Sequence, residues 1–135
     1  MTVLVDTSAL VALLDRDGPR RGLAVDVLAG LRAGGMPLVT HEYVVVETIS
    51  LVQRRLGMAA LRVLVDEIVP LAEVQWVDPE LHAEAREALL AAGRRGVSLV
   101  DWVSFLVMRR RGIRTAFAFD ADFATEGFEL IPAPA

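Results

Sequence analysis

The feature that most constrains the fold of this chain is the alternation of short apolar runs with longer segments of helical periodicity. Apolar runs of strand length occupy residues 2–5, 37–39, 74–77 and 113–119, and residues 129–131 predict an edge strand. Apolar residues at helical spacing predict helices at residues 8–14, 20–33, 42–56 (with Thr40 as its cap), 59–69, 79–92 and 98–111. This alternation indicates an α/β layered domain with a mostly parallel sheet and right-handed crossovers.

Length and composition favour a single domain covering residues 1–135. Apolar residues make up 54% of the chain, enough for a substantial core without disulfides. The absence of Cys excludes thiol nucleophiles and thiolate metal sites, and two isolated His are too few for a zinc site. We find neither a secretion signal nor an apolar run of membrane-spanning length, so we expect a cytoplasmic protein that does not enter the membrane.

Two acids lie at the carboxyl ends of predicted strands, where sites form in open α/β sheets. Asp6 directly follows the run 2–5, Asp120 follows the run 113–119, and Asp122 lies two residues further on. Each position also has a local explanation. Asp6 is a candidate cap of the next helix, and Asp120 is a candidate for stabilising an Asx-type turn.

Two further acids lie on predicted helices among apolar residues. Glu47 is two turns into the helix that Thr40 caps, and Asp101 lies three residues after Ser98. The local explanations are a capping box formed by Ser98 and Asp101, and an ordinary surface position for Glu47.

The net charge of −4 does not itself indicate a nucleic-acid-binding protein. Net charge is a poor guide, however, where a bound cation neutralises several clustered acids.

The local explanations weaken together if the four acids converge in space. Two carboxylates about 4 Å apart repel by about 4 kcal/mol at an effective dielectric constant of about 20. Protonation or a bound divalent cation offsets this repulsion. Oxygen ligands without His or Cys select hard cations such as Mg²⁺ or Mn²⁺, which activate water and stabilise the leaving oxygen in phosphoryl chemistry. The residues alone therefore indicate a candidate acidic metal pocket.

Four segments in order resemble the PIN-domain family and, within it, the VapC toxins. They are VLVDTSAL (3–10), THEYVVVE (40–47), SLVDW (98–102) and TAFAFDADF (115–123), followed by Gly127. These segments cover the chain from end to end at the usual length of the family. One departure is Ala118, where many relatives have Thr or Ser, so no hydroxyl role is expected there.

The resemblance implies a site, an activity and partners. The catalytic and metal-binding acids would be Asp6, Glu47, Asp101 and Asp120, with Asp6 and Asp101 as the direct ligands. Ser8 would help to place water or phosphate, and Asp122 would be an auxiliary acid. The implied activity is endonucleolytic cleavage of RNA by water activated by Mg²⁺ or Mn²⁺, leaving a 5′-phosphate. The implied fold is a four- to five-stranded sheet with helices on both faces. The implied partners are a VapB-like antitoxin of a type II toxin–antitoxin system and a second copy of the chain.

Other residues are side candidates with simpler alternatives. Arg94, Arg95 and Arg109 are candidate contacts for RNA phosphates, and the alternative is favourable charge at helix C-termini and solvated faces. His41 and Tyr43 suit surface or capping roles better than catalysis. The apolar helices at residues 8–14 and 51–69 are a candidate face for the dimer or the antitoxin, with ordinary core burial as the alternative.

Two other classes of function remain open from the sequence. One is another metal-dependent phosphodiesterase, DNA nuclease or small phosphatase, which an acidic pocket also suits. Against a phosphatase, Asp6 is followed by Thr and Ser and not by an Asp-x-Asp nucleophile motif. The other is a non-catalytic PIN module that acts only by binding partners.

Overall fold

The computed structural model describes residues 1–134. Its strands are β1 (Val3–Val5), β2 (Leu38–His41), β3 (Glu73–Gln75), β4 (Thr115–Phe117) and β5 (Glu129–Ile131). Its α-helices are α1 (Thr7–Leu14), α2 (Arg21–Ala33), α3 (Glu42–Arg55), α4 (Met58–Val63), α5 (Pro79–Ala92), α6 (Leu99–Arg111) and α7 (Asp122–Thr125). A π-helical turn, η1 (Leu64–Ile68), and a 3₁₀ turn, η2 (Val69–Leu71), follow α4.

The five strands form one parallel sheet in the order β3-β2-β1-β4-β5. Strand β1 is central, because Val3 pairs with Leu38 on one side and with Thr115 on the other. The chain builds outward from β1 through β2 and β3, then returns to the opposite side of β1 at β4. The carboxyl ends of β1 and β4 therefore flank the point where the strand order reverses, which is where α/β sheets bind ligands.

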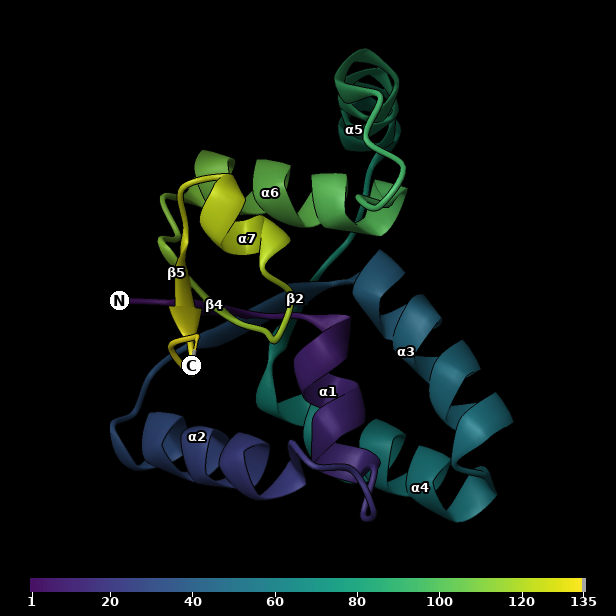
Figure 1. The fold of residues 1–135 in the computed structure, drawn as a ribbon, viewed down its shortest axis with the longest axis vertical. Helices are drawn as coiled ribbons and strands as arrows, with labels where there is room; N and C mark the ends of the chain where they lie inside the picture. The colour runs from purple at the N-terminus through teal and green to yellow at the C-terminus, as the bar shows by residue number, and fades with distance from the viewer. Residues whose placement is uncertain (135) are drawn as a thin grey trace.

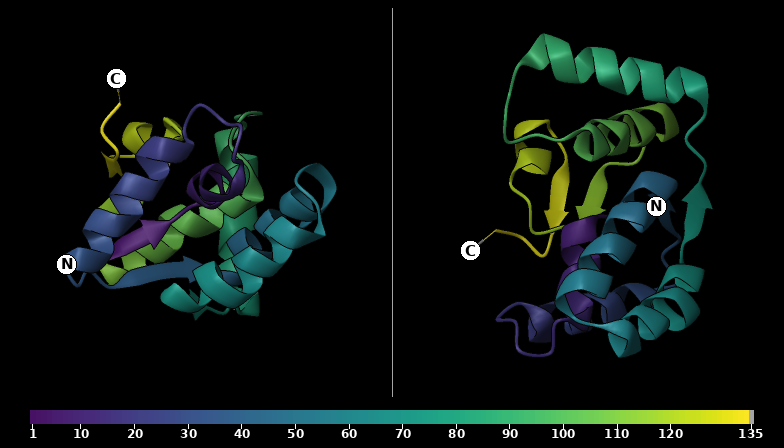
Figure 2. Two further views of the ribbon diagram at one scale, coloured as in Figure 1. Left: turned by 90° about the horizontal axis from the view of Figure 1, so that it is seen from below. Right: turned by 90° about the vertical axis from the view of Figure 1, so that its right-hand side faces the viewer.

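Two layers of helices cover the two faces of the sheet (Figures 1 and 2). Val3 and Val5 pack with the helices α1 to α4, whereas Leu4, between them, packs with Phe105 of α6 on the other face. This alternation follows from the strand geometry, in which successive side chains point to opposite faces. The predicted α/β fold with helices on both faces is confirmed, and the sheet is parallel throughout.

Strand β4 is shorter than the predicted strand over residues 113–119. The N–H of Ile113 donates to the carbonyl of Met108 at 2.9 Å, which keeps Ile113 in the C-terminal cap of α6. At the other end, the N–H of Phe119 donates to the hydroxyl of Ser8 at 2.9 Å. Both ends of the apolar run are therefore hydrogen-bonded outside the sheet.

The cap of α3 is His41 and not the predicted Thr40. The Nδ1 atom of His41 accepts from the N–H of Val44 at 3.4 Å, while the Thr40 hydroxyl donates to the Val5 carbonyl at 2.8 Å. Thr40 still belongs to β2, so its side chain links two strands.

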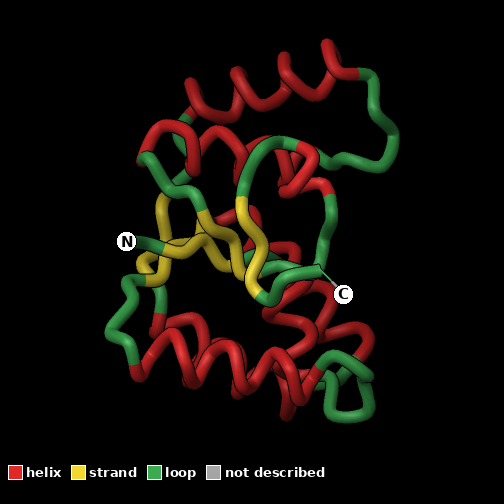
Figure 3. The backbone as a smooth tube through the Cα atoms, turned by 60° about the vertical axis from the view of Figure 1, so that its left-hand side comes forward, coloured by secondary structure: helices red, strands yellow, loops and turns green. Residues whose placement is uncertain are grey.

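The predicted helix over residues 59–69 consists of three pieces: α4, the π turn η1 and the 3₁₀ turn η2. Figure 3 draws all helical segments in red, on both sides of the yellow strands. Pro70 lies in η2, where the missing N–H and the ring prevent a regular α-helix from continuing. The four-residue helix α7 is too short to produce a periodic pattern, and the sequence did not predict it. Among residues 1–134, no helix combines the length and the apolar character needed to cross a membrane.

Candidate active site

Asp6 lies at the carboxyl end of β1 and is only 3% exposed. It caps α1 from an extended backbone conformation, and its Oδ2 accepts from the N–H and the hydroxyl of Ser8 at 3.1 and 2.7 Å. The Ser8 hydroxyl in turn accepts from the N–H of Phe119, the residue before Asp120. The predicted capping role is correct, and Ser8 joins Asp6 to the segment that carries Asp120.

Asp101 and Asp120 also have the local roles that the sequence suggested. Asp101 and Ser98 form a capping box, in which the Asp101 N–H donates to Ser98 Oγ at 3.2 Å and the Ser98 N–H donates to Asp101 Oδ2 at 2.8 Å. Asp120 Oδ1 accepts from the N–H of Asp122 at 2.9 Å. Within residues 1–134, the hydrogen bonds to Asp6, Asp101 and Asp120 each use one carboxylate oxygen. The second oxygen of each remains available to a ligand.

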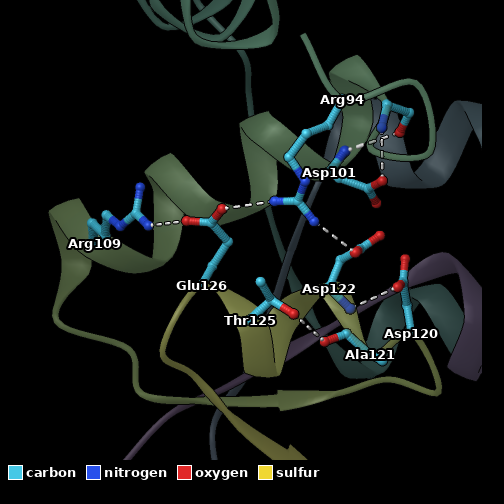
Figure 4. A network of polar contacts seen from close by, with 9 residues as sticks. Arg94, Asp101, Arg109, Asp120, Ala121, Asp122, Thr125 and Glu126 are labelled. Carbon is cyan, nitrogen blue, oxygen red and sulfur yellow. Dashed lines mark hydrogen bonds and ion pairs between the residues drawn. The ribbon is translucent and has the colours of Figure 1, made fainter. Parts of the chain in front are cut away.

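Three carboxylates cluster beyond the carboxyl end of β4. Asp101 comes from α6, Asp120 from the loop after β4, and Asp122 from the start of α7. Each contributes an oxygen that lies within 4.8 Å of the other two, and the three side chains point toward one another in Figure 4. We call this group the acidic pocket. Asp122, predicted as an auxiliary acid, is one of its three closest members.

The pKa values of the buried acids show that the predicted quartet shares one electrostatic environment. Burial raises the pKa of Asp6 to about 7; the hydrogen bonds from Ser8 oppose this rise, and the charges of Asp101 and Asp120 add to it. Burial also raises the pKa of Asp101, and the charge of Glu47 contributes to that rise. Glu47 therefore lies close enough to act on the pocket, although the three-oxygen cluster does not include it.

An ion-pair network holds α7 against the neighbouring segments (Figure 4). Arg94 pairs with Asp122 at 3.0 Å and with Glu126 at 3.2 Å, and Arg109 of α6 pairs with Glu126 at 2.7 Å. Burial and the charge of Asp120 raise the pKa of Asp122, whereas Arg94 lowers it. Two of the predicted RNA-contact arginines, Arg94 and Arg109, are thus paired with acids. Sequence reasoning missed Glu126, because nothing local marks a pairing across 32 residues.

The third predicted RNA-contact residue has a different environment. Arg95 is exposed in the loop between α5 and α6, and no ion pair or side-chain hydrogen bond within the described part of the chain involves it. Arg95 therefore remains accessible to a charged ligand from solvent.

A buried hydrogen bond connects the two helices that carry Glu47 and Asp101. His41, at the start of α3, is fully buried, and its Nε2 lies 2.8 Å from the hydroxyl of Ser104 on α6. Burial lowers the pKa of His41 to about 4, so its ring is neutral at neutral pH. Because Nδ1 accepts from the backbone, Nε2 carries the proton and donates to Ser104. His41 therefore caps α3 in place of Thr40 and also links the start of α3 to α6.

The composition of the acidic pocket fits a divalent cation. Its donors are carboxylate oxygens, which hard cations prefer. Among residues 1–134, ion pairs reach Asp122 but none reaches Asp6, Asp101 or Asp120. Burial raises the pKa of Asp6, and the charges of Asp101 and Asp120 add to this rise because no positive charge among the described residues pairs with them.

The fold and the site define a class of α/β proteins with a carboxylate-lined pocket where the strand order of a parallel sheet reverses. The chain belongs to the PIN domain family, whose model matches residues 3–128. It is 38% identical over 128 residues to the 23S rRNA-specific endonuclease VapC20 of Mycobacterium tuberculosis, an alignment that covers 93% of this chain and 95% of VapC20. The predicted resemblance to PIN domains and VapC proteins is confirmed.

Solved structures agree with this assignment. The crystal structure of Mycobacterium tuberculosis VapC20, described as a Sarcin-Ricin loop cleaving toxin, matches with a TM-score of 0.82 and 36% identity. That match covers 94% of this chain and 96% of VapC20. FitAcB from Neisseria gonorrhoeae matches with a TM-score of 0.69 at 18% identity over 96% of each chain, and this likeness shows the shared fold alone.

Proposed function

We propose that this protein is the toxin of a type II toxin–antitoxin system, a divalent-metal-dependent endoribonuclease that acts in the cytoplasm. The observation that carries the proposal is the convergence of Asp101, Asp120 and Asp122 beside the buried Asp6 in a PIN domain. The 38% identity to a 23S rRNA-specific endonuclease over 93% of the chain supports ribosomal RNA as the substrate.

The residues of the pocket have distinct roles in this proposal. Asp6, Asp101 and Asp120 use their available oxygens to hold Mg²⁺ or Mn²⁺, with Glu47 and Asp122 completing the negative site. A bound ion supplies an activated water and stabilises the charge that develops on the leaving oxygen. Ser8 orients Asp6 through the two hydrogen bonds that it donates.

Two features of the pocket hold these acids in place. Helix α7 carries Asp122 and is fixed by the pairs that Arg94 and Arg109 form with it. Helices α3 and α6 are fixed by the bond between His41 and Ser104. A pocket held in this way keeps its carboxylates close before an ion arrives, which favours tight binding.

The test is an RNA-cleavage assay on the purified protein with Mg²⁺ or Mn²⁺. Substrates are a sarcin–ricin-loop RNA hairpin, total RNA, tRNA, single-stranded DNA and a phosphomonoester. We expect cleavage of the hairpin, inhibition by a chelator, and a loss of at least about 100-fold in Asp6→Asn, because the pocket then lacks a ligand charge. The matched control is Asp26→Asn, which removes an exposed acid of α2 and leaves cleavage unchanged.

Other results would select the other classes. Cleavage of DNA or of the phosphomonoester in preference to RNA would identify a different metal-dependent phosphodiesterase or phosphatase. A wild-type protein that neither cuts any substrate nor binds a divalent ion in calorimetry would be a non-catalytic partner-binding module.

We also propose a VapB-like antitoxin as the protein partner. A surface groove between α1, α3 and α4 has an apolar wall formed by Leu14, Leu56 and Val63. Its charged residues are of both signs: Asp15, Arg16, Asp17, Arg21 and Arg55. This groove suits an amphipathic segment that carries charges of both signs beside its apolar face. Co-purification of a co-expressed antitoxin that is lost in Val63→Asp would support it, and retention of the complex would exclude this face.

A further inference from the structure

Arg20 contacts the ring of Phe119, the residue that directly precedes Asp120 of the acidic pocket. Its guanidinium carbon is 5.1 Å from the centroid of the Phe119 ring. Phe119 directly precedes Asp120, and its N–H donates to the Ser8 hydroxyl that bonds to Asp6. A side chain held on Phe119 is therefore next to the segment on which the pocket is built.

Apart from the Phe119 ring, no partner among the described residues uses the charge of Arg20. Arg20 is exposed, and no ion pair or side-chain hydrogen bond within residues 1–134 involves it. It is the N-cap of α2 and makes no capping bond, and a cation at this end of a helix is disfavoured by the helix dipole. The adjacent Arg21 differs, because its Nε donates to the Leu13 carbonyl at 3.1 Å.

The geometry leaves the guanidinium of Arg20 suited to a phosphate. An arginine over an aromatic ring is attracted through the face of its planar group, while its N–H edges stay available for hydrogen bonds. A guanidinium binds a phosphate through two parallel N–H···O bonds. Of the arginines near the pocket, Arg94 and Arg109 already pair with acids, whereas Arg20 and Arg95 do not.

These two unpaired arginines lie on opposite helical layers. Arg20 precedes α2 in the layer of α1 to α4, and Arg95 lies in the loop before α6 in the other layer. Figure 1 shows α2 and α6 on opposite sides of the sheet.

We propose that Arg20, held over Phe119, binds a backbone phosphate of the RNA next to the bond that is cut. The inference rests on the proposed ribonuclease function and names a substrate-binding residue for it. A phosphate contact of this kind fixes the position of the strand without reading its sequence.

The test is the affinity of a fluorescein-labelled sarcin–ricin-loop RNA hairpin, measured by anisotropy in the presence of a chelator that prevents cleavage. We expect Arg20→Ala to weaken binding about tenfold, because a charge-assisted hydrogen bond is lost. The plot of log affinity against log salt concentration becomes less steep by about 0.7 to 0.9, as expected for one phosphate contact. Arg20→Lys should keep the salt slope, because the positive charge remains. Its affinity should be intermediate, because an ammonium group lacks the two parallel N–H donors of the guanidinium.

The matched control is Arg32→Ala, which removes an exposed arginine from the other end of the same helix. An unchanged affinity and salt slope in Arg32→Ala would support a local contact at Arg20. Equal losses of affinity in both variants would indicate a general effect of charge and would overturn the proposed contact. If the wild type cuts the hairpin and Arg20→Ala binds like the wild type, the Arg20 inference is wrong while the ribonuclease proposal stands. A wild type that neither binds the hairpin in chelator nor cuts it with Mg²⁺ or Mn²⁺ overturns both. Thermal unfolding of Arg20→Ala equal to the wild type verifies that the variant is folded.

Discussion

At the scale of single residues, two buried titratable groups make opposite contributions to stability as pH changes. Asp6 has a pKa of about 7 in the folded protein against an ordinary value of 3.8. At a pH between 3.8 and about 7, Asp6 is protonated in the folded chain and ionised in the unfolded chain. Raising the pH through this range therefore lowers the free energy of unfolding, and the whole contribution of Asp6 is lost above about pH 7. His41 has a pKa of about 4 against 6.5. At a pH between about 4 and 6.5, His41 is charged in the unfolded chain and neutral in the folded chain. Lowering the pH through this range therefore lowers the free energy of unfolding.

We therefore predict that Asp6→Asn changes the pH dependence of stability in the metal-free protein. Asn caps a helix about as well as Asp, so the main change is the loss of the titrating group. Between pH 5 and 6.5 the free energy of unfolding should rise more steeply with pH than in the wild type, by up to about 1.4 kcal/mol per pH unit. At pH 8 the variant should be more stable by about 1 to 3 kcal/mol.

Urea unfolding in the presence of a chelator at pH 5, 6.5 and 8 measures this difference. The control Asp26→Asn alters an exposed acid of α2 and should follow the wild-type curve. Parallel curves for Asp6→Asn and the wild type would mean that Asp6 is ionised in the folded protein at all three pH values.

At the scale of elements, α6 illustrates how one residue serves two purposes. Asp101 completes the capping box with Ser98 and also faces the acidic pocket. Its local role was predictable from the spacing of the two residues. Its role in the pocket depends on where α6 lies against β1 and β4, which the local pattern does not determine.

We predict that Ser98→Ala lowers the free energy of unfolding by about 1 kcal/mol, because the N–H of Asp101 loses its acceptor at the start of α6. Ser98→Thr keeps a capping hydroxyl and should retain most of the wild-type value. Ser50→Ala, an exposed site on α3, should change stability by less than about 0.5 kcal/mol. Equal stability of Ser98→Ala and Ser50→Ala in urea unfolding would show that the cap contributes nothing.

The elements also show where prediction from sequence ends. Helices α5 and α6 were predicted to within a residue, because Asp78 and Ser98 mark their starts and Gly93 and Gly112 adopt positive φ at their ends. Asp6 and Asp101 were candidates from their positions, whereas their assignment as metal ligands came from the resemblance to PIN domains. The sequence did not predict the π turn after α4, because the spacing of its side chains is close to that of an α-helix.

The contacts that the sequence did not predict join residues far apart in the chain. The bond between His41 and Ser104 spans 63 residues, and the pair of Arg94 with Asp122 spans 28. Contacts of this kind depend on the packing of whole elements, and no local pattern of residue types indicates them. The position of Arg20 over Phe119 is a further example.

At the scale of the whole molecule, the acidic pocket draws its members from α6, from the loop after β4 and from α7. A divalent ion bound there would add a cross-link between these segments, which are far apart in the sequence. We predict that Mn²⁺ at about 100 times its dissociation constant raises the free energy of unfolding by about 2.7 kcal/mol, since it binds the folded chain alone. A chelator should reverse the effect, and Asp101→Asn should abolish it while Asp26→Asn does not. An unchanged midpoint in thermal unfolding would contradict metal binding.

We also predict that the protein forms homodimers through a face that includes Val46 and Trp76, whose side chains are 61% and 76% exposed. The N–H of Val77 donates to Glu42 at 2.7 Å, which places the segment after β3 against the first turn of α3, one turn before Val46. Exposed apolar side chains grouped in this way indicate an interface. Trp76→Arg should shift the sedimentation coefficient from dimer to monomer, whereas Leu90→Arg, at an equally exposed site on α5, should not.

The pairing of β1 with β4 sets an order of events during translation. The ribosome makes β1 first, yet one of its two neighbouring strands is Thr115–Phe117, near the other end of the chain. Asp6 therefore has no Asp120 beside it until β4 has been synthesised, has emerged from the ribosome and has docked. A nascent chain that stalls before β4 lacks the pocket, so the acids assemble only after more than 100 residues beyond β1 have been added.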